Sequence, residues 1–334
     1  MKQESPETGS NAVVVLPVLN EADYIVDALY DLRGGNVDVP IWVMDGGSTD
    51  GTLELLHDLA AGDALLQVIH NPGRLQSHAI NLAAYLAQNA GYDVLVRADA
   101  HCRYPAGFVN AMVTLQTHLK ADSVTVPLIA TKVGYNRWQL ANGDLQRNWL
   151  GNGGAQHRNL GRSTWVDHGH HAAFLLSRFM ELGGYDTDLS ACEDVDYDLR
   201  QRAAGGRIWL ASNWPVVYMP RTSPRTTWLQ MLRNGMARTQ VAKKNHKALN
   251  RRQLLPVLAC SALIAAPFGL LWWPVAVPAV SYLMLVFALS VQIGRKGGIG
   301  HSLRIAALAI TAHMGFSAGV LRGFSKQLIR GVQA

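Results

Sequence analysis

The stretch Val94-Leu95-Val96-Arg97-Ala98-Asp99-Ala100-His101 is an apolar strand that ends in a carboxylate and an imidazole separated by one residue. Because side chains alternate along an extended segment, Asp99 and His101 are expected to point the same way from the strand's end. An oxygen and a nitrogen so placed suit one divalent cation, which could hold a diphosphate. The alternative is a strand followed by a polar turn, and an isolated Asp-x-His favours that alternative. The neighbouring segments therefore decide the interpretation.

The 334-residue chain has the composition of a folded protein, with 49% hydrophobic residues, nine Trp and a formal charge of +6. Much of the basic excess lies after Arg221, beside apolar segments, which favours anionic lipid over nucleic acid as a partner. The three cysteines form no CxxC pair, which fits a reduced cytosolic compartment. Residues 1–10 are polar and lack the pattern of a signal peptide, so we expect a disordered N-terminus and a cytoplasmic domain after it.

Apolar runs alternate with helical patterns and glycine-rich turns through the first hundred residues. The runs 12–16, 41–44 and 65–69 are short and rich in β-branched residues, and each predicts a buried parallel strand that Val94–Val96 continues. Apolar residues at helical spacing lie between them. This alternation predicts an α/β fold with a mostly parallel sheet and helices on both faces.

Acidic residues follow three of these predicted strands, at Glu21, Asp45 and Asp99. In open α/β sheets, ligands bind beyond the carboxyl ends of the strands. The turn 45–51 is rich in glycine, but it matches neither GxGxxG nor GxxxxGK[ST]. It therefore lacks the phosphate-binding residues that a dinucleotide site or a P-loop requires. A carboxylate at a strand end can instead accept hydrogen bonds from a nucleobase or a ribose hydroxyl.

Three segments resemble, in their order and spacing, a family 2 inverting glycosyltransferase with a Rossmann-like GT-A fold. They are Pro17-Val18-Leu19-Asn20-Glu21, Asp45-Gly46-Gly47-Ser48-Thr49-Asp50-Gly51-Thr52 and Asp99-Ala100-His101. The resemblance implies that the chain binds a UDP-sugar through Pro17, Asn20, Glu21, Asp45, Gly46 and Asp99. It also implies that Asp99 and His101 hold Mg²⁺ or Mn²⁺ on the diphosphate, as the family's DxD motif does. Since His101 replaces the second Asp, this side chain could bind either the metal or a phosphate oxygen.

A further segment resembles members of the family that build succinoglycan-type exopolysaccharides. It comprises Asn71-Pro72-Gly73-Arg74-Leu75-Gln76 together with Asn81. The resemblance places Arg74 against the diphosphate. An ordinary solvated arginine is the alternative.

Residues 130–165 are rich in Gly, Asn and Arg and show no sustained period, which predicts a long functional loop or lid. Sugar rings stack on aromatic faces, so Trp149 in this segment is a candidate acceptor-binding residue. A surface loop with incidental tryptophans is the alternative.

The segment Val166–Phe174 predicts a strand with polar residues toward one end, among them His168, His170 and His171. A zinc site is disfavoured because no fourth ligand follows at a familiar spacing. The segment resembles the family's strand under the acceptor site, which implies that His170 and His171 bind the acceptor.

The run Ser190-Ala191-Cys192-Glu193-Asp194-Val195-Asp196-Tyr197-Asp198 places four acids in six positions at a predicted helix N-terminus. The backbone dipole there favours negative charge, and an N-cap explains one acid but not four. Inverting sugar transfer needs a base that takes the proton of the acceptor hydroxyl. The run resembles the family's Glu-Asp motif, which implies that Asp194 is that base and Glu193 its supporting partner.

The segment Gln230-Met231-Leu232-Arg233-Asn234 resembles the family's QxxRW motif with Asn in the last place. The resemblance implies that Gln230 and Arg233 contact the donor from an amphipathic helix at the membrane surface. Arg233 could instead snorkel toward lipid headgroups.

Residues 254–272, 275–293 and 303–321 are apolar segments of about the 20 residues that a bilayer crossing needs. Basic residues flank the first two segments, which predicts a hairpin inserted from the cytoplasm. The third contains Arg304 and His313, and both a third span and a re-entrant or interfacial segment stay open. A core hairpin of a soluble protein is disfavoured by the flanking cations.

Together these features predict a GT-A domain over 11–225, amphipathic basic interface helices over 226–253 and a membrane domain over 254–334. The resemblance implies an enzyme of the bacterial inner membrane that moves a sugar, expected to be glucose, from a UDP-sugar to a polyprenyl-diphosphate-linked acceptor during exopolysaccharide assembly. A processive synthase is disfavoured by Asn234 and by the small membrane part. A non-catalytic UDP-sugar-binding subunit is disfavoured by the joint presence of Asp99, Glu193 and Asp194.

Overall fold

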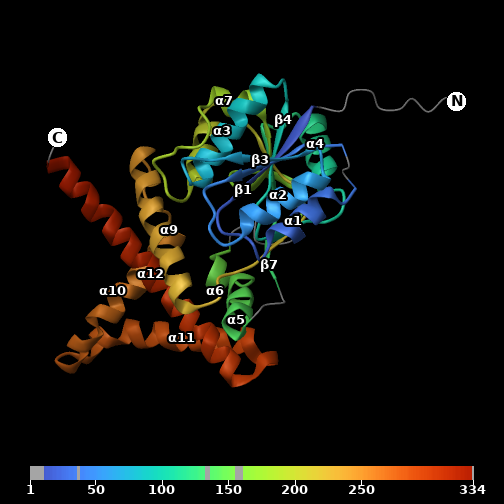
Figure 1. Ribbon diagram of the computed structural model, residues 1–334. Helices are drawn as coiled ribbons and strands as arrows, with labels where there is room; N and C mark the ends of the chain where they lie inside the picture. The colour runs from blue at the N-terminus through green and yellow to red at the C-terminus, as the bar shows by residue number, and fades with distance from the viewer. Residues whose placement is uncertain (1–10, 36–37, 132–135, 155–160, 333–334) are drawn as a thin grey trace. The chain divides into compact units, whose positions relative to one another are not determined.

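The computed structural model describes residues 11–35, 38–131, 136–154 and 161–332, and the disorder predicted for residues 1–10 lies outside this part. The chain divides into two compact units. The first comprises residues 1–128, 159–188 and 193–218, and the second comprises residues 129–158, 189–192 and 219–334. Figure 1 labels several elements of each unit.

The first unit is built on an eight-stranded sheet with the order β3-β2-β1-β4-β9-β6-β10-β8. The pairs β1/β2, β2/β3, β1/β4 and β6/β10 are parallel, whereas β9 is antiparallel to β4 and β6, and β8 is antiparallel to β10. The bounds are β1 Ala12–Val18, β2 Ile41–Asp45, β3 Leu66–His70, β4 Val94–Arg97, β6 Ser123–Val126, β8 Thr164–Val166, β9 His170–Leu175 and β10 Ile208–Leu210. The mostly parallel sheet predicted from the alternating pattern is confirmed.

Helices cover both faces of this sheet (Figure 1). On one face, α3 Gln76–Asn89 packs its buried alanines against Val13, Val15 and Leu95, and α7 Leu176–Glu181 packs beside it. On the other face, α4 Phe108–Leu119 packs against β4, β6 and β9, and its N-terminus meets the C-terminus of α1 Ile25–Arg33 through the Gly107 N–H and the Gly34 carbonyl. The unit also contains α2 Thr52–Gly62, α8 Glu193–Ala203, and β5 Cys102–Arg103 paired with β11 Val216–Tyr218, and the chain leaves it through β7 Leu128–Ala130.

The register of the central strands brings the predicted acids to one edge of the sheet. Val18 at the end of β1 lies opposite Asp45 on β2, and Val15 lies opposite Arg97 on β4. The carboxyl ends of these parallel strands therefore open onto a common edge, where such sheets bind ligands. One expectation is wrong in detail: β4 ends at Arg97, so the turn that follows, rather than strand alternation, sets the directions of Asp99 and His101.

The second unit is helical in its described residues. Its elements are α5 Arg137–Gln146, α6 Trp149–Asn152, α9 Pro224–Lys244, α10 Arg251–Ala265, η2 Ala266–Leu270, η3 Trp273–Ala276, α11 Val277–Gly294, η4 Arg295–Gly297 and α12 Gly298–Val332. An apolar core joins α5 and α6 to α11 and α12 through Leu145, Leu150, Val286 and Leu308. Helix α12 also packs along α9.

Helix α5 lies where the sequence predicts a long irregular loop. Asn136 caps its N-terminus by accepting hydrogen bonds from the backbone N–H groups of Trp138 and Gln139. Its buried face includes polar residues: Gln139 donates to the Pro220 carbonyl and Asn142 donates to the Arg221 carbonyl. The sequence lacks the hydrophobic periodicity that predicts a helix, because the polar side chains on this face form hydrogen bonds with backbone carbonyls and do not pack as an apolar stripe.

Two apolar helical stretches of the second unit, Arg251–Leu270 and Trp273–Ser325, are long and apolar enough to cross a membrane. The predicted segments 275–293 and 303–321 both fall within the second stretch, where η4 separates α11 from α12. Large apolar side chains are exposed along them, including Leu270 (95%) and Trp273 (73%). This composition fits lipid contact better than contact with water.

The packing of α9 on α12 predicts which glycines cannot be replaced. A Cβ atom on Gly235 would lie 2.2 Å from the Phe316 carbonyl oxygen, and one on Gly319 would lie 2.2 Å from the Leu232 carbonyl oxygen. Small residues of this kind let helix backbones approach closely. We expect Gly235→Ala or Gly319→Ala to destabilise the protein by about 1–3 kcal/mol, measured as a lower Tm in detergent.

The matched control is Gly300→Ala near the start of α12, where the nearest atom to a new Cβ is the Arg304 Nη1 at 3.6 Å. Ala is the better helix former, so this variant should keep or slightly raise Tm. An equal loss of Tm in all three variants would show that the α9–α12 contact is not responsible.

Candidate active site

The turn after β2 forms one wall of the candidate donor site. Asp45 is buried and accepts hydrogen bonds from the Gly47 N–H (2.9 Å) and from the Ser48 hydroxyl (2.6 Å). A Cβ on Gly46 would lie 3.1 Å from the Arg74 carbonyl oxygen. The Asp45 turn and the Arg74 segment are thus in close backbone contact, which only a small residue at position 46 permits.

The end of β1 is tied to the same turn. Pro17 lies opposite Met44 within the sheet, and the Asn20 Oδ1 accepts a hydrogen bond from the Thr49 N–H at 2.8 Å. Glu21 lies beside His101, with 3.1 Å between its Oε1 and the imidazole Nδ1. The predicted donor-binding residues of the first unit therefore cluster at one edge of the sheet, and His101 points to Glu21.

Asp99 is held asymmetrically by its neighbours. Its Oδ1 accepts hydrogen bonds from the Arg97 guanidinium (3.4 Å) and from the Gln76 amide (3.1 Å). Its Oδ2 lies 3.5 Å from the His170 Nε2. The side chain is 13% exposed, so one oxygen is anchored while the other faces an imidazole.

Electrostatics fix the charge states at this position. Burial alone would raise the pKa of Asp99, but Arg97 and the nearby histidines lower the pKa to about 2. Burial lowers the pKa of His170 to about 4, which keeps its imidazole neutral at pH 7. Burial also opposes the charge of Arg97, but Asp99, Glu193 and Asp194 raise the pKa of its guanidinium. Asp99 is thus an ionised carboxylate between a fixed cation and a neutral imidazole.

The acid pair lies at the N-terminus of α8. Asp194 accepts a hydrogen bond from the Val195 N–H at 2.8 Å. Burial and the neighbouring Asp194 raise the pKa of Glu193. The charge of Asp194 also acts on the pKa values of Arg97 and His170, so the pair shares the electrostatic environment of Asp99.

Four side chains form what we call the buried chain, Arg97–Tyr185–His171–Asp198. The Arg97 Nη1 donates to the Tyr185 hydroxyl (3.0 Å), which lies 2.7 Å from the His171 Nδ1. The His171 Nε2 lies 2.7 Å from the Asp198 Oδ1, and the Asp198 Oδ2 lies 2.6 Å from the Nδ1 of His168. The four side chains are buried: Arg97 is 6% exposed, Tyr185 and Asp198 are each 1% exposed, and His171 is 0% exposed. This continuous path joins Asp99 to α8.

The structure corrects the expected role of His171. Its side chain is fully buried, and both ring nitrogens are within hydrogen-bond distance of Tyr185 and Asp198. It therefore offers no polar atom to an acceptor. The predicted single strand over 166–174 is also interrupted, because β8 ends at Val166 and β9 starts at His170, which leaves His168 between them.

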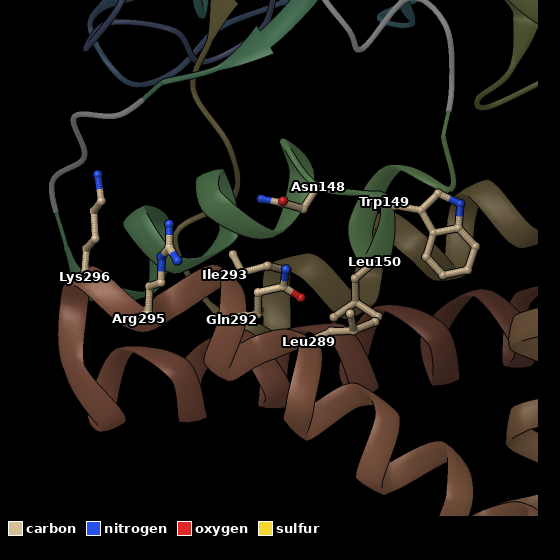
Figure 2. A pocket seen from close by; sticks show the side chains of 8 residues that line it. All are labelled: Asn148, Trp149, Leu150, Leu289, Gln292, Ile293, Arg295 and Lys296. Atoms are coloured by element: carbon tan, nitrogen blue, oxygen red, sulfur yellow. The ribbon is translucent and has the colours of Figure 1, made fainter.

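The remaining candidates belong to the second unit. Gln230 and Arg233 lie on α9, and Trp149 is the first residue of α6, with 58% of its surface exposed. A pocket of about 390 Å³ lies among α6, the end of α11 and η4. Figure 2 shows the side chains that line it. It is lined by Asn148, Trp149, Leu150, Leu289, Gln292, Ile293, Arg295 and Lys296.

Sequence reasoning missed Arg97, Tyr185 and Asp198. A signal for Arg97 was present, because a permanently charged residue at the end of an apolar strand requires a buried acceptor. Asp198 belongs to the acid run 193–198, which contains more acids than a helix cap needs. That excess did not assign a role to Asp198. Tyr185 carries no sequence signal, since only the tertiary fold brings it between Arg97 and His171.

Comparisons with known proteins identify the family of the chain. The family model for glycosyl transferase family 2 matches residues 13–183. The succinoglycan biosynthesis protein ExoA of Rhizobium meliloti (strain 1021) is 33% identical over 319 residues, which cover 94% of this chain and 95% of that protein.

Two solved structures show the same fold at low sequence identity. The mannosyltransferase PcManGT from Pyrobaculum calidifontis, in complex with GDP-Man and Mn²⁺, matches with a TM-score of 0.58 at 18% identity and covers 97% of this chain and 92% of that one. S. aureus TarS matches with a TM-score of 0.51 at 11% identity and covers 93% of this chain and 55% of that one. From the family model and the extent of the ExoA match, the chain belongs to glycosyl transferase family 2 and has the GT-A fold.

Proposed function

We propose that this glycosyltransferase is a membrane-bound inverting enzyme that moves a sugar, expected to be glucose, from a UDP-sugar to a polyprenyl-diphosphate-linked acceptor during exopolysaccharide assembly. The observation that carries the proposal is the pairing of an ionised, partly exposed Asp99 with the half-buried acids Glu193 and Asp194 in one electrostatic environment. Such a site can bind the donor and take a proton from the acceptor. The relationship to a succinoglycan biosynthesis protein supports the exopolysaccharide assignment.

The donor would bind at the common strand edge. Asp45 and Glu21 would face the uridine, with Pro17, Asn20 and Gly46 shaping the cleft, and Arg74 would face the diphosphate. Arg74 has a left-handed backbone (φ 60°) and its carbonyl packs on Gly46, which supports a fixed position for this segment. The contact of Gln230 and Arg233 with the donor stays a prediction of the family resemblance. A nucleotide-sugar complex of PcManGT supports this substrate class.

A divalent cation, Mg²⁺ or Mn²⁺, fits the donor set around Asp99. The carboxylate is ionised, its Oδ2 is not taken up by Arg97 or Gln76, and a neutral imidazole lies 3.5 Å from that oxygen. Among the described residues no group of three His, Cys, Asp or Glu side chains is placed to hold a metal, so substrate phosphates would have to complete the coordination, as is usual for Mg²⁺. Asp99 would hold the ion with His101 or His170, and the ion would stabilise negative charge on departing UDP.

The transfer step needs one base and no covalent intermediate. The acceptor oxygen forms a bond to the anomeric carbon while the bond from that carbon to the UDP oxygen breaks, and UDP departs with the electron pair. Asp194 takes the proton of the attacking hydroxyl. Glu193, whose pKa is raised by burial and by Asp194, would support the charge balance of the pair.

The second unit would hold the enzyme at the inner membrane and receive the lipid-linked acceptor. We propose that the GT-A part, residues 11–225, faces the cytoplasm, that basic helices over 226–253 lie at the interface, and that residues 254–334 enter the bilayer. The two apolar stretches support attachment to a membrane. The pocket of Figure 2 combines Trp149, which can stack on a sugar, with the cations Arg295 and Lys296, which can bind phosphate.

The function is tested by UDP release from a panel of UDP-sugars with Mg²⁺ or Mn²⁺, with and without lipid extract. We expect lipid-dependent release from wild-type protein, and loss of at least about 100-fold in kcat for Asp194→Asn with donor affinity near normal, because only the base is removed. Asp58→Asn on the exposed face of α2 is the matched control and should keep full activity. No release from any donor would refute the enzyme, and full activity of Asp194→Asn would refute the base.

The pocket makes a separate prediction about the acceptor. Replacing both Arg295 and Lys296 by Gln should raise the KM for the lipid acceptor about tenfold, with the KM for UDP-sugar unchanged, because two phosphate-binding cations are lost. Arg251→Gln, an exposed cation at the start of α10, is the control for general attraction to anionic lipid. An equal effect of the control would assign the loss to surface charge and not to the pocket.

A further inference from the structure

With a neutral His171 imidazole, the hydrogen-bond directions in the buried chain follow from its two ends. At one end, the Arg97 guanidinium can only donate, so the Tyr185 oxygen accepts. At the other end, His171 and His168 lower the pKa of Asp198 against the effect of burial, so its carboxylate only accepts. The His171 Nε2–H therefore donates to Asp198, and the Tyr185 hydroxyl donates to the His171 Nδ1. Every hydrogen bond in the chain points from Arg97 toward Asp198.

Tyr185 is held in this position by its backbone. The Asn81 side chain forms two hydrogen bonds with it, accepting from the Tyr185 N–H (2.8 Å) and donating to the Tyr185 carbonyl (2.7 Å). Arg200 of α8 donates to the Gly184 carbonyl (2.6 Å) and to the Leu182 carbonyl. Tyr185 thus has little freedom to follow a movement of Arg97, and it lies on a segment that α8 itself holds.

The far end of the chain is on the helix that carries the acid pair. Asp198 and Asp194 are four residues apart on α8, which places them on the same face, one turn from each other. A rotation of α8 that displaced Asp194 would also displace Asp198 from His171. The near end of the chain contacts Asp99 through Arg97. The two ends of the chain are therefore attached to the proposed base helix and to the proposed diphosphate carboxylate.

The composition of the chain argues for a positioning role. Burying a guanidinium, a phenol, an imidazole and a carboxylate costs desolvation energy, and apolar side chains of similar volume often stabilise a core as well or better. The neighbouring Tyr197 illustrates the contrast: it is also fully buried, its ring packs 5.7 Å from that of Tyr185, and its hydroxyl has no hydrogen-bond partner in the described part of the chain. A buried phenol in this core therefore does not need a polar network for packing alone.

We propose that Tyr185, His171 and Asp198 are positioning residues that act through Arg97 and α8. They hold the guanidinium against the Oδ1 of Asp99, leave the Oδ2 for the cation and diphosphate, and fix the distance between Asp99 and Asp194. This inference rests on the proposed function of the same site. It extends the site by three residues that contact neither donor nor acceptor.

The test compares Tyr185→Phe with Tyr197→Phe, which remove one hydroxyl each from the same aromatic cluster. We measure Mn²⁺ affinity in the presence of UDP by electron paramagnetic resonance, together with kcat, KM and Tm. Tyr185→Phe should weaken Mn²⁺ affinity about tenfold and lower kcat, since supporting residues of a metal site contribute 10–100-fold. Tyr197→Phe should leave Mn²⁺ affinity, kcat and KM unchanged.

A purely structural role gives a different pattern. Tyr185→Phe would then lower Tm alone, with Mn²⁺ affinity and kcat of the folded protein equal to wild type, and that result would overturn the proposal. Asp198→Asn keeps the side-chain shape and tests the far end of the chain; the same direction of change in Mn²⁺ affinity is expected, and wild-type affinity would again overturn it. The binding measurement needs no sugar transfer, so failure of the proposed function, seen as absent UDP release by wild-type protein, is distinguished from failure of the positioning role.

Discussion

The ion pair between the buried Arg97 and the partly exposed Asp99 constrains the rest of the first unit. An arginine side chain cannot lose its charge in a protein, so a guanidinium at the end of a central strand must be surrounded by acceptors. Asp99 supplies one acceptor and Tyr185 another, and the second requires His171 on β9 and Asp198 on α8. A single charge on β4 thereby sets the arrangement of a neighbouring strand, a loop and a helix.

The same ion pair separates the two kinds of carboxylate at the site. Asp99 has a pKa of about 2 because Arg97 outweighs the effect of burial. Glu193 has a raised pKa because burial and the charge of Asp194 act together, and the charge of Arg97 only partly offsets them. Carboxylates in one cleft whose pKa values are pushed apart can perform different tasks. A permanently ionised Asp99 suits a cation and diphosphate, while the pair on α8 suits proton transfer.

Much of the fold was predictable because it depends on local patterns. The apolar runs before Glu21, Asp45 and Asp99 predicted parallel strands, and the order of polar segments identified the family. Helix α5 was not predicted, since its buried face is satisfied by backbone carbonyls instead of an apolar stripe. The assignment of His171 to the acceptor was wrong for a related reason: a histidine that closes a buried network and one that lines a cleft have the same sequence signature. Residues that act through long-range contacts, above all Tyr185, require the tertiary structure.

The central claim is that Asp99 is the carboxylate on which the donor's diphosphate and its cation depend. The most direct measurement is the affinity of Mn²⁺ for the UDP-bound protein in wild type and in Asp99→Asn, a substitution that preserves shape and removes the charge. The structure predicts a loss of about tenfold or more, because the amide cannot replace an ionised oxygen ligand. Equal Mn²⁺ affinity in the two proteins would contradict the assignment of this strand end to the donor.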